Sequence, residues 1–210
     1  WPALKPVRER RGFVEFPAVA GRLRAGAFAW AVFTSPANVR FFAAALKENR
    51  LDARILAPAH VAAAGGGTAA QLAGVGILAD AVAERPGGRG LLEALAGAAG
   101  GGVLLLQGAQ APDALAEALR GRGHDVTRLA LHKAVRHPEL GRPLPEHDVI
   151  YFTSPSGVRA AHEVYGGGVF EKRVWCIGRV TRRALSALGV DGEVVNPNVP
   201  DHKNAAVQAH

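Results

Sequence analysis

Nearly the same motif occurs twice in this chain, and the duplication restricts the folds that the chain can adopt. Residues 33–40 read FTSPANVR, and residues 152–159 read FTSPSGVR. A short apolar run precedes each copy and apolar residues at helical spacing follow it, which predicts a strand, a turn and a helix. Ser or Thr before Pro marks a helix start, because the hydroxyl caps backbone amides and Pro presets φ.

Each predicted turn places a helix N-terminus at the end of a strand. The first amides of a helix and the positive end of its dipole form a seat for a carboxylate or phosphate. Alternatively, the hydroxyls of the two turns only cap the helices; they belong to Thr34, Ser35, Thr153 and Ser154. Two copies in one chain favour a shared ligand site over capping alone.

A second pair of segments repeats further along the chain. Residues 65–76 align with residues 178–189 when Thr68 is placed on Thr181. Each segment predicts a Gly-x-x-Thr turn after a strand, then a helix that ends at a glycine cap. The internal repeat therefore covers two successive strand–helix units.

The first half contains a further block of strand, helix and strand. Residues 103–106 form a fully apolar run typical of a parallel sheet, and a helix at 113–122 and a strand at 125–131 are predicted after it. The second half has no counterpart of this block unless residues 1–17 supply one; there, residues 13–19 alternate and predict a strand. Alternating strands and helices predict doubly wound parallel-sheet α/β domains.

These patterns predict two similar domains. One is continuous, over residues 26–130, and the other is discontinuous, formed by residues 1–18 with residues 142–210. The chain crosses between them twice, at predicted linkers 19–25 and 131–141, so the connection has two strands. We expect the repeated helix starts to face a cleft between the domains.

Composition narrows the possible partners. Apolar residues make up 49% of the 210 residues and the net charge is +7, which favours an anionic partner: nucleic acid, a polyanionic metabolite or an anionic membrane. The Arg residues are scattered without interleaved aromatics, which argues against nucleic acid. Short apolar runs broken by glycine predict neither a membrane span nor a signal peptide, and hence a cytoplasmic protein. The single cysteine, Cys176, is predicted to be a buried thiol.

The order and duplication of these motifs resemble the uroporphyrinogen-III synthase family over nearly the whole chain. Besides the repeats, the resemblance rests on LLLQG at residues 104–108 and AVRHP at residues 134–138. It implies two α/β domains joined by a two-stranded linker, and a cyclising lyase that needs no cofactor. The implied substrate is hydroxymethylbilane, a polyanionic linear tetrapyrrole that loses water and closes with inversion of its D ring to give uroporphyrinogen III.

The resemblance also assigns the site residues by position. Substrate binding is expected at the turns after the repeated strands and at the Gln-Gly turn: Thr34, Ser35, Gly65, Thr68, Gln107, Gly108, Thr153, Ser154, Gly157, Gly178 and Thr181. His132 stands where the family usually carries a Tyr implicated in loss of the hydroxyl. Its imidazolium is a candidate proton donor, the alternative being an ordinary linker residue. Thr181 is the other catalytic candidate.

The alternatives to this assignment are a metal site, a nucleotide site and a non-catalytic binding protein. The histidines His60, His132, His137 and His162 lack metal-ligand spacing, and the glycine run at 65–67 matches no nucleotide-binding fingerprint, so no metal or nucleotide is expected. The protein is expected to be a monomer. The competing class is a non-catalytic two-lobed module that binds an anion or a tetrapyrrole, since paired α/β lobes serve both purposes.

Overall fold

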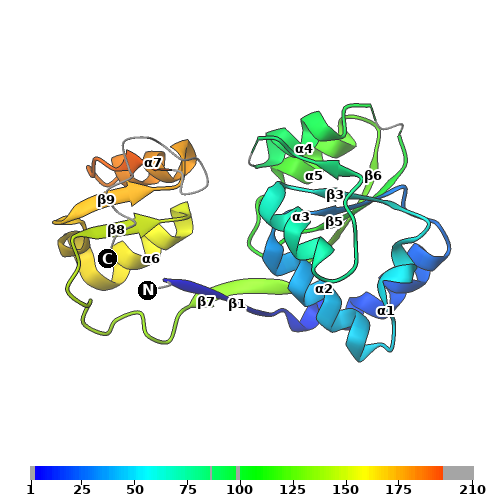
Figure 1. The fold of residues 1–210 in the computed structure, drawn as a ribbon, viewed down its shortest axis with the longest axis horizontal. Helices are drawn as coiled ribbons and strands as arrows, with labels where there is room; N and C mark the ends of the chain where they lie inside the picture. The colour runs from blue at the N-terminus through cyan, green and yellow to red at the C-terminus, as the bar shows by residue number, and fades with distance from the viewer. Residues whose placement is uncertain (1–2, 86, 98–99, 196–210) are drawn as a thin grey trace. The chain divides into compact units, whose positions relative to one another are not determined.

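A computed structural model describes residues 3–85, 87–97 and 100–195 of the chain (Figure 1). The chain divides into two compact units. The longer unit consists of residues 6–134, and the shorter unit consists of residues 1–5 together with residues 135–210. Among the described residues, no helix combines the length and the apolar character needed to cross a lipid bilayer.

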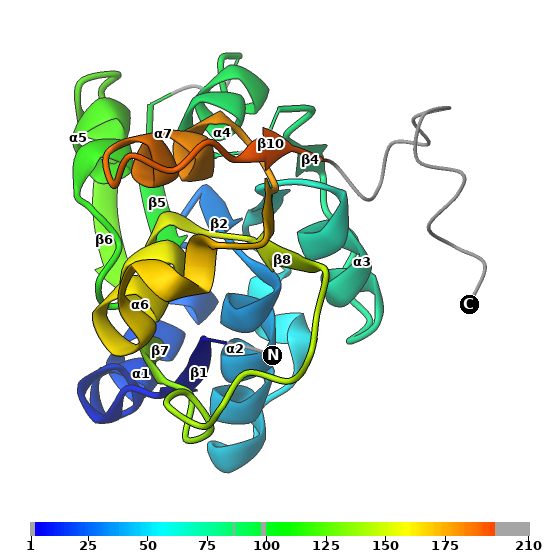
Figure 2. The ribbon, with the colours of Figure 1, turned by 90° about the vertical axis from the view of Figure 1, so that its left-hand side faces the viewer.

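The longer unit is built on a five-stranded parallel sheet, in which β2 (Trp30–Phe33) is the middle strand of the order β4-β3-β2-β5-β6. The other strands are β3 (His60–Ala63), β4 (Ala81–Val82), β5 (Gly102–Leu106) and β6 (Asp125–Leu129). Figure 2 shows β2, β5 and β6 side by side. Phe33 pairs with Ala63 on one side and with Leu106 on the other, so the turns after these three strands leave the sheet at one edge.

Helices cover both faces of this sheet because its buried strands alternate between two cores. The first core receives Phe33 and Leu106 and is covered by α1 (Arg10–Arg24), α2 (Pro36–Glu48) and α3 (Gly66–Ala73). The second core receives Val32 and Leu105 and is covered by α4 (Gly88–Ala94) and α5 (Ala114–Arg120), on the opposite side of the sheet in Figure 1. This confirms the predicted doubly wound fold.

The prediction for the start of the chain is wrong. Residues 13–19 form the middle of helix α1 rather than a strand, because Phe13, Phe16 and Leu23 recur at helical spacing and bury their side chains. These side chains belong to the first core of the longer unit, so residues 6–18 do not pack with residues 142–210. Residues 19–25, predicted as a linker, are mostly the second half of α1.

Two short strands connect the units. They are β1 (Leu4–Arg8) and β7 (His132–Arg136), which pair as a two-stranded sheet. Backbone hydrogen bonds flank this ribbon, from Glu9 N to Leu131 O and from His137 N to Ala3 O, both at 3.0 Å. The boundaries between the units fall within both strands, so the two-stranded linker is confirmed, with β1 in place of the first predicted segment.

The shorter unit repeats part of the longer one. Its parallel sheet has the order β10-β9-β8, with β8 (Val149–Phe152), β9 (Arg173–Cys176) and β10 (Glu193–Val194). Helix α6 (Pro155–Tyr165) follows β8, and α7 (Arg179–Ser186) follows β9. Cys176 is fully buried in the core of this unit, as predicted. Two strand–helix pairs of the shorter unit therefore have counterparts in the longer unit: β8–α6 corresponds to β2–α2, and β9–α7 corresponds to β3–α3.

Candidate functional site

The first Thr-Ser-Pro turn satisfies its own polar groups. Ser35 caps α2, and its Oγ accepts a hydrogen bond from the backbone N of Asn38 at 3.3 Å. The Asn38 side-chain Nδ2 donates to Ser35 Oγ and to Thr34 Oγ1, both at 3.0 Å. Thr34 Oγ1 in turn donates to Leu106 O at 3.0 Å. The hydroxyls predicted to bind substrate are therefore occupied within the protein, as the capping alternative expects.

Asn38 was not identified from the sequence, although it decides the character of this turn. It is 1% exposed, and its Oδ1 has no hydrogen-bond partner among the described residues. The second copy of the motif has Gly157 at this position. The side chain that ties the first turn together is thus missing from the second.

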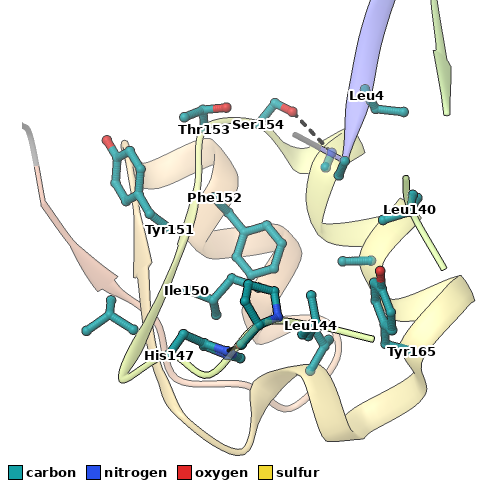
Figure 3. A pocket seen from close by; sticks show the side chains of 16 residues that line it. Leu4, Leu140, Leu144, His147, Ile150, Tyr151, Phe152, Thr153, Ser154 and Tyr165 are labelled. Carbon is teal, nitrogen blue, oxygen red and sulfur yellow. Dashed lines mark hydrogen bonds between the residues drawn. The ribbon is translucent and has the colours of Figure 1, made fainter. Parts of the chain in front are cut away.

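The second Thr-Ser-Pro turn is more open. Ser154 caps α6 by accepting from Gly157 N at 3.1 Å, and its Oγ also lies 3.1 Å from Ser156 Oγ. Thr153 is exposed. Thr153, Ser154 and Gly157 line a cavity of about 720 Å³ beside β8 (Figure 3). Of the two copies, the second leaves space next to its polar groups.

The glycine turns present backbone amides that no side chain caps. Helix α3 begins after Gly65 and α7 begins after Gly178, and neither helix has a side-chain capping hydrogen bond. Thr68 and Thr181 are buried, at 4% and 2% exposed. The amides of the first helical turn, rather than these hydroxyls, are therefore the donors that an anion could reach.

Gln107 has an internal partner. It is 3% exposed, and in the amide orientation that satisfies both of its polar atoms its Oε1 accepts from Arg128 Nη2 at 2.7 Å and from Arg128 Nε at 3.0 Å. Arg128 also donates to Ala111 O at 3.1 Å and forms an ion pair with Asp113. The Gln107 side chain therefore shapes the turn after β5 and points to β6, while Gly108 remains at the surface of the turn.

His132 lies directly beside Gly108. A Cβ added to Gly108 would come within 3.1 Å of His132 Cε1. The imidazole stacks on Phe41, with ring centroids 5.5 Å apart and an interplanar angle of 25°. Both ring nitrogens are buried and have no hydrogen-bond partner in the described part of the chain. Burial, and secondarily the charge of Arg40, lowers the pKa of His132 below its ordinary value.

The electrostatics of His132 change its expected role. Because its pKa is lowered, the imidazole is neutral at neutral pH and carries no positive charge in the ligand-free protein. Proton donation from this ring requires an anionic group nearby to stabilise its charged form. The residues that surround it, Arg40 and Phe41, were not identified from the sequence. The signal for Arg40 was present, because both copies of the repeated motif end in Arg.

The predicted residues gather at one sheet edge in each unit. In the longer unit these residues are Thr34, Ser35, Gly65, Thr68, Gln107 and Gly108, with His132 next to Gly108. In the shorter unit they are Thr153, Ser154, Gly157, Gly178 and Thr181, after the adjacent strands β8 and β9. Such an edge, at the carboxyl ends of parallel strands, is where doubly wound folds bind ligands. In the described residues, no group of three or more His, Cys, Asp or Glu side chains could hold a metal ion.

Solved structures share this fold. The wild-type uroporphyrinogen III synthase of the extremely thermophilic bacterium Thermus thermophilus is 26% identical with a TM-score of 0.56, covering 93% of this chain and 80% of that one. A mutant of the enzyme from the same organism is 22% identical with a TM-score of 0.64, covering 94% and 82%. The uroporphyrinogen-III synthetase of Helicobacter pylori is 17% identical with a TM-score of 0.62, covering 94% and 86%. A search of curated proteins finds no match.

The fold and its turns define a class of two-unit α/β protein in which helices start at the carboxyl ends of parallel strands. A protein-family model described as uroporphyrinogen-III synthase HemD matches residues 4–202. The chain therefore belongs to the uroporphyrinogen-III synthase family. Its activity is that of this family, a lyase that cyclises a linear tetrapyrrole in heme biosynthesis.

Proposed function

We propose that the chain binds the carboxylates of hydroxymethylbilane on backbone amides at its helix starts and so directs cyclisation to uroporphyrinogen III. The observation that carries this proposal is the repeated uncapped start of α3 and α7, where glycines leave the first amides without side-chain partners. Each pyrrole of the substrate carries two carboxylates, so the ligand is a flexible polyanion. Helix starts and a net charge of +7 suit such a ligand.

The reaction requires the site to hold the D ring of the substrate in one particular position. The hydroxyl of the substrate leaves as water once it is protonated, and the cation left behind is attacked by the substituted carbon of the D ring. Holding the chain of pyrroles so that this carbon attacks first is a matter of proximity and orientation. Fixed amides on rigid helices suit that purpose, because they require no reorganisation when the carboxylates bind.

His132 is assigned the proton transfer in this proposal. Its ring is neutral in the ligand-free protein, so the polyanionic substrate itself must raise the pKa of the imidazole on binding. The ring then has a proton to donate to the leaving hydroxyl. The stacked ring of Phe41 holds the imidazole in place, and Gly108 packs on the ring so closely that an added Cβ would lie 3.1 Å from Cε1.

The binding role of the α3 start is tested with Gly66, the first residue of that helix. Gly66→Pro removes one donor but keeps a helix start, because Pro is tolerated at the first helical position. Hydrogen bonds to charged groups contribute roughly 1.5–3 kcal/mol, so we expect KM to rise about 10- to 100-fold. Gly66→Ala keeps the amide, and no atom within 4 Å would crowd the added Cβ, so its KM should match the wild type. Equal KM values for all three proteins would remove this amide from the site.

We further propose that the protein acts as a monomer in the cytoplasm, without nucleic acid or membrane. The scattered basic residues support the absence of a nucleic-acid partner. Sedimentation equilibrium at micromolar concentration tests the oligomeric state, with the mass of one 21.9 kDa chain expected. A dimer mass at these concentrations would contradict it.

A further inference from the structure

A pocket of about 380 Å³ lies between the C-terminal ends of α2 and α3 in the longer unit. These two helices pack against each other (Figure 1). Leu46 of α2 and Ile77, which follows α3, are the most buried residues of the pocket, at 5% and 7% exposed. The half-buried side chains of Leu51, Ala53 and Val75 extend its apolar wall. The turns proposed to bind substrate lie at the starts of the same helices, so the pocket is a separate site at their other ends.

The charged residues that line this pocket leave it with a net positive charge. Lys47 and Arg50 are exposed, and neither forms an ion pair in the part of the chain that the structure describes. Asp52 also lines the pocket, but Arg54 donates to both of its oxygens, from Nε to Oδ1 at 2.9 Å and from Nη2 to Oδ2 at 2.8 Å. These hydrogen bonds lower the pKa of Asp52. Its charge is thus compensated by Arg54, whereas the charges of Lys47 and Arg50 are not.

Arg50 has an unusual backbone conformation. It follows the end of α2 in a Schellman motif, in which Leu51 N donates to Leu46 O at 2.9 Å and Arg50 N donates to Lys47 O at 3.1 Å. The motif requires a left-handed conformation, and Arg50 has a φ of 53°. Among the described residues, no other residue except glycine has a positive φ. A side chain at this position strains the backbone, because Cβ approaches the following carbonyl oxygen.

The same motif ends four other helices, and each of them has glycine where α2 has Arg50. These helices are α1, α3, α5 and α7, and their glycines, with φ between 71° and 85°, are Gly26, Gly76, Gly123 and Gly189. Glycine adopts this conformation without strain. A cation near the end of a helix interacts favourably with the helix dipole, but Lys47 in the last turn of α2 already supplies one. The feature that sets Arg50 apart from the four glycines is a guanidinium that lines the pocket.

We propose that the pocket between the ends of α2 and α3 binds a small organic carboxylate with an apolar body. The planar guanidinium of Arg50 matches a carboxylate and can donate two parallel hydrogen bonds to it. Lys47 adds a second positive charge at the same pocket. The aliphatic wall formed by Leu46, Leu51 and Ile77 receives the apolar body of the ligand, as in other small-molecule sites.

The size and the charge of the pocket decide which ligand fits. Pockets for small molecules have volumes of about 300–1,000 Å³, and this one is near the lower limit. It suits a single ring or a short aliphatic chain rather than a tetrapyrrole. Two uncompensated cations favour an anion over a neutral molecule of the same shape. This proposal concerns a second ligand and does not depend on how hydroxymethylbilane binds.

The test is a titration of the full ¹⁵N-labelled chain with octanoate, followed by NMR. We expect saturable shifts of the amide signals of Leu51, Ala53 and Val75. Octanol has the same aliphatic chain without the charge and should bind about 3- to 10-fold more weakly. Equal affinity for octanol would overturn the proposal, as would the absence of shifts at these amides below the concentration at which octanoate forms micelles. Because the full chain is used, a segment of the chain that occupied the pocket would give this second result.

Variants of the protein separate binding in the pocket from effects on folding. Arg50→Gly removes the guanidinium and relieves the backbone, so it should bind octanoate about 3- to 10-fold more weakly while resisting urea better than the wild type. Ala43→Phe keeps both cations but fills the pocket, which Ala43 lines, and should abolish binding. Arg89→Gln is the matched control, because it removes an exposed cation from α4 on the other face of the sheet and should leave binding unchanged. Wild-type affinity in either Arg50→Gly or Ala43→Phe would overturn the proposal.

Discussion

His132 shows, at the scale of single residues, how packing changes the chemistry that a sequence motif implies. Its position relative to the linker suggested a proton donor, but its ring is stacked on Phe41 and buried beside Gly108. Burial disfavours the charged imidazolium, and Arg40 adds repulsion of the same sign. His132, the proposed proton donor, therefore becomes positively charged at neutral pH only when an anion binds next to it.

The lowered pKa of His132 predicts a pH-dependent stability difference. In the unfolded chain the imidazole binds a proton near its ordinary pKa of about 6.5, whereas in the folded protein it does so only at lower pH. The unfolded state thus binds more protons in this window, and the folded state loses stability as the pH falls through it. Thermal unfolding of wild type and His132→Phe from pH 8 to pH 5 should show the wild type losing more stability. Parallel curves would contradict the assignment.

Asn38 provides the second prediction at this scale. Its side chain joins both hydroxyls of the first Thr-Ser-Pro turn while being almost fully buried. Asn38→Ala should lower the free energy of unfolding by about 1–2 kcal/mol, since each net hydrogen bond contributes roughly 0.5–1.5 kcal/mol. The matched control is Gly157→Ala in the other copy, where no such network exists and the loss should be smaller. Urea unfolding measures both, and equal losses would show that Asn38 does not hold its turn together.

At the scale of elements, the repeated strand–turn–helix units were predictable because their signals are local. Ser35 and Ser154 cap their helices as the Ser-Pro pattern indicates, and Gly65 and Gly178 precede α3 and α7. The start of the chain was not predictable in the same way. Alternating apolar residues around Pro17 resemble a strand, but tertiary packing of α1 on the sheet selected a helix that tolerates this proline.

The side chain of Gln110, which was not identified from the sequence, binds the linker strand β7 to the longer unit through two hydrogen bonds. Gln110 Nε2 donates to Ala134 O at 2.8 Å, and Gln110 Oε1 accepts from Ala134 N at 2.9 Å. The boundary between the units follows directly after Ala134. Gln110 thus fixes where the ribbon leaves the longer unit.

The prediction for the ribbon of β1 and β7 concerns the loss of the two hydrogen bonds between Gln110 and Ala134. Gln110→Ala should speed amide hydrogen exchange at Ala134 about 10-fold, because the amide loses its acceptor. The amide of Glu9, which donates to Leu131 O at 3.0 Å, serves as an internal control and should exchange at its original rate. Unchanged exchange at Ala134 would show that Gln110 does not anchor the strand.

For the whole molecule, the order of the duplicated motifs predicted the fold class and the family, because both follow from the sequence pattern of the chain. The roles of individual side chains required the fold. Gln107 was a predicted substrate ligand, yet its partner Arg128 comes from the next strand, and no local signal joins the two. Similarly, the two Thr-Ser-Pro turns look equivalent in sequence. In the structure the Asn38 side chain joins the two hydroxyls of the first turn, whereas Gly157 has no side chain and the second turn lines a cavity.

Product analysis tests whether this chain directs the closure of hydroxymethylbilane to one isomer. Freshly generated hydroxymethylbilane is incubated with the protein, and the type I and type III isomers are separated after oxidation. We expect predominantly type III product, formed faster than in a protein-free control. Type I product alone, formed at the spontaneous rate by protein shown to be folded by circular dichroism, would contradict the proposed function.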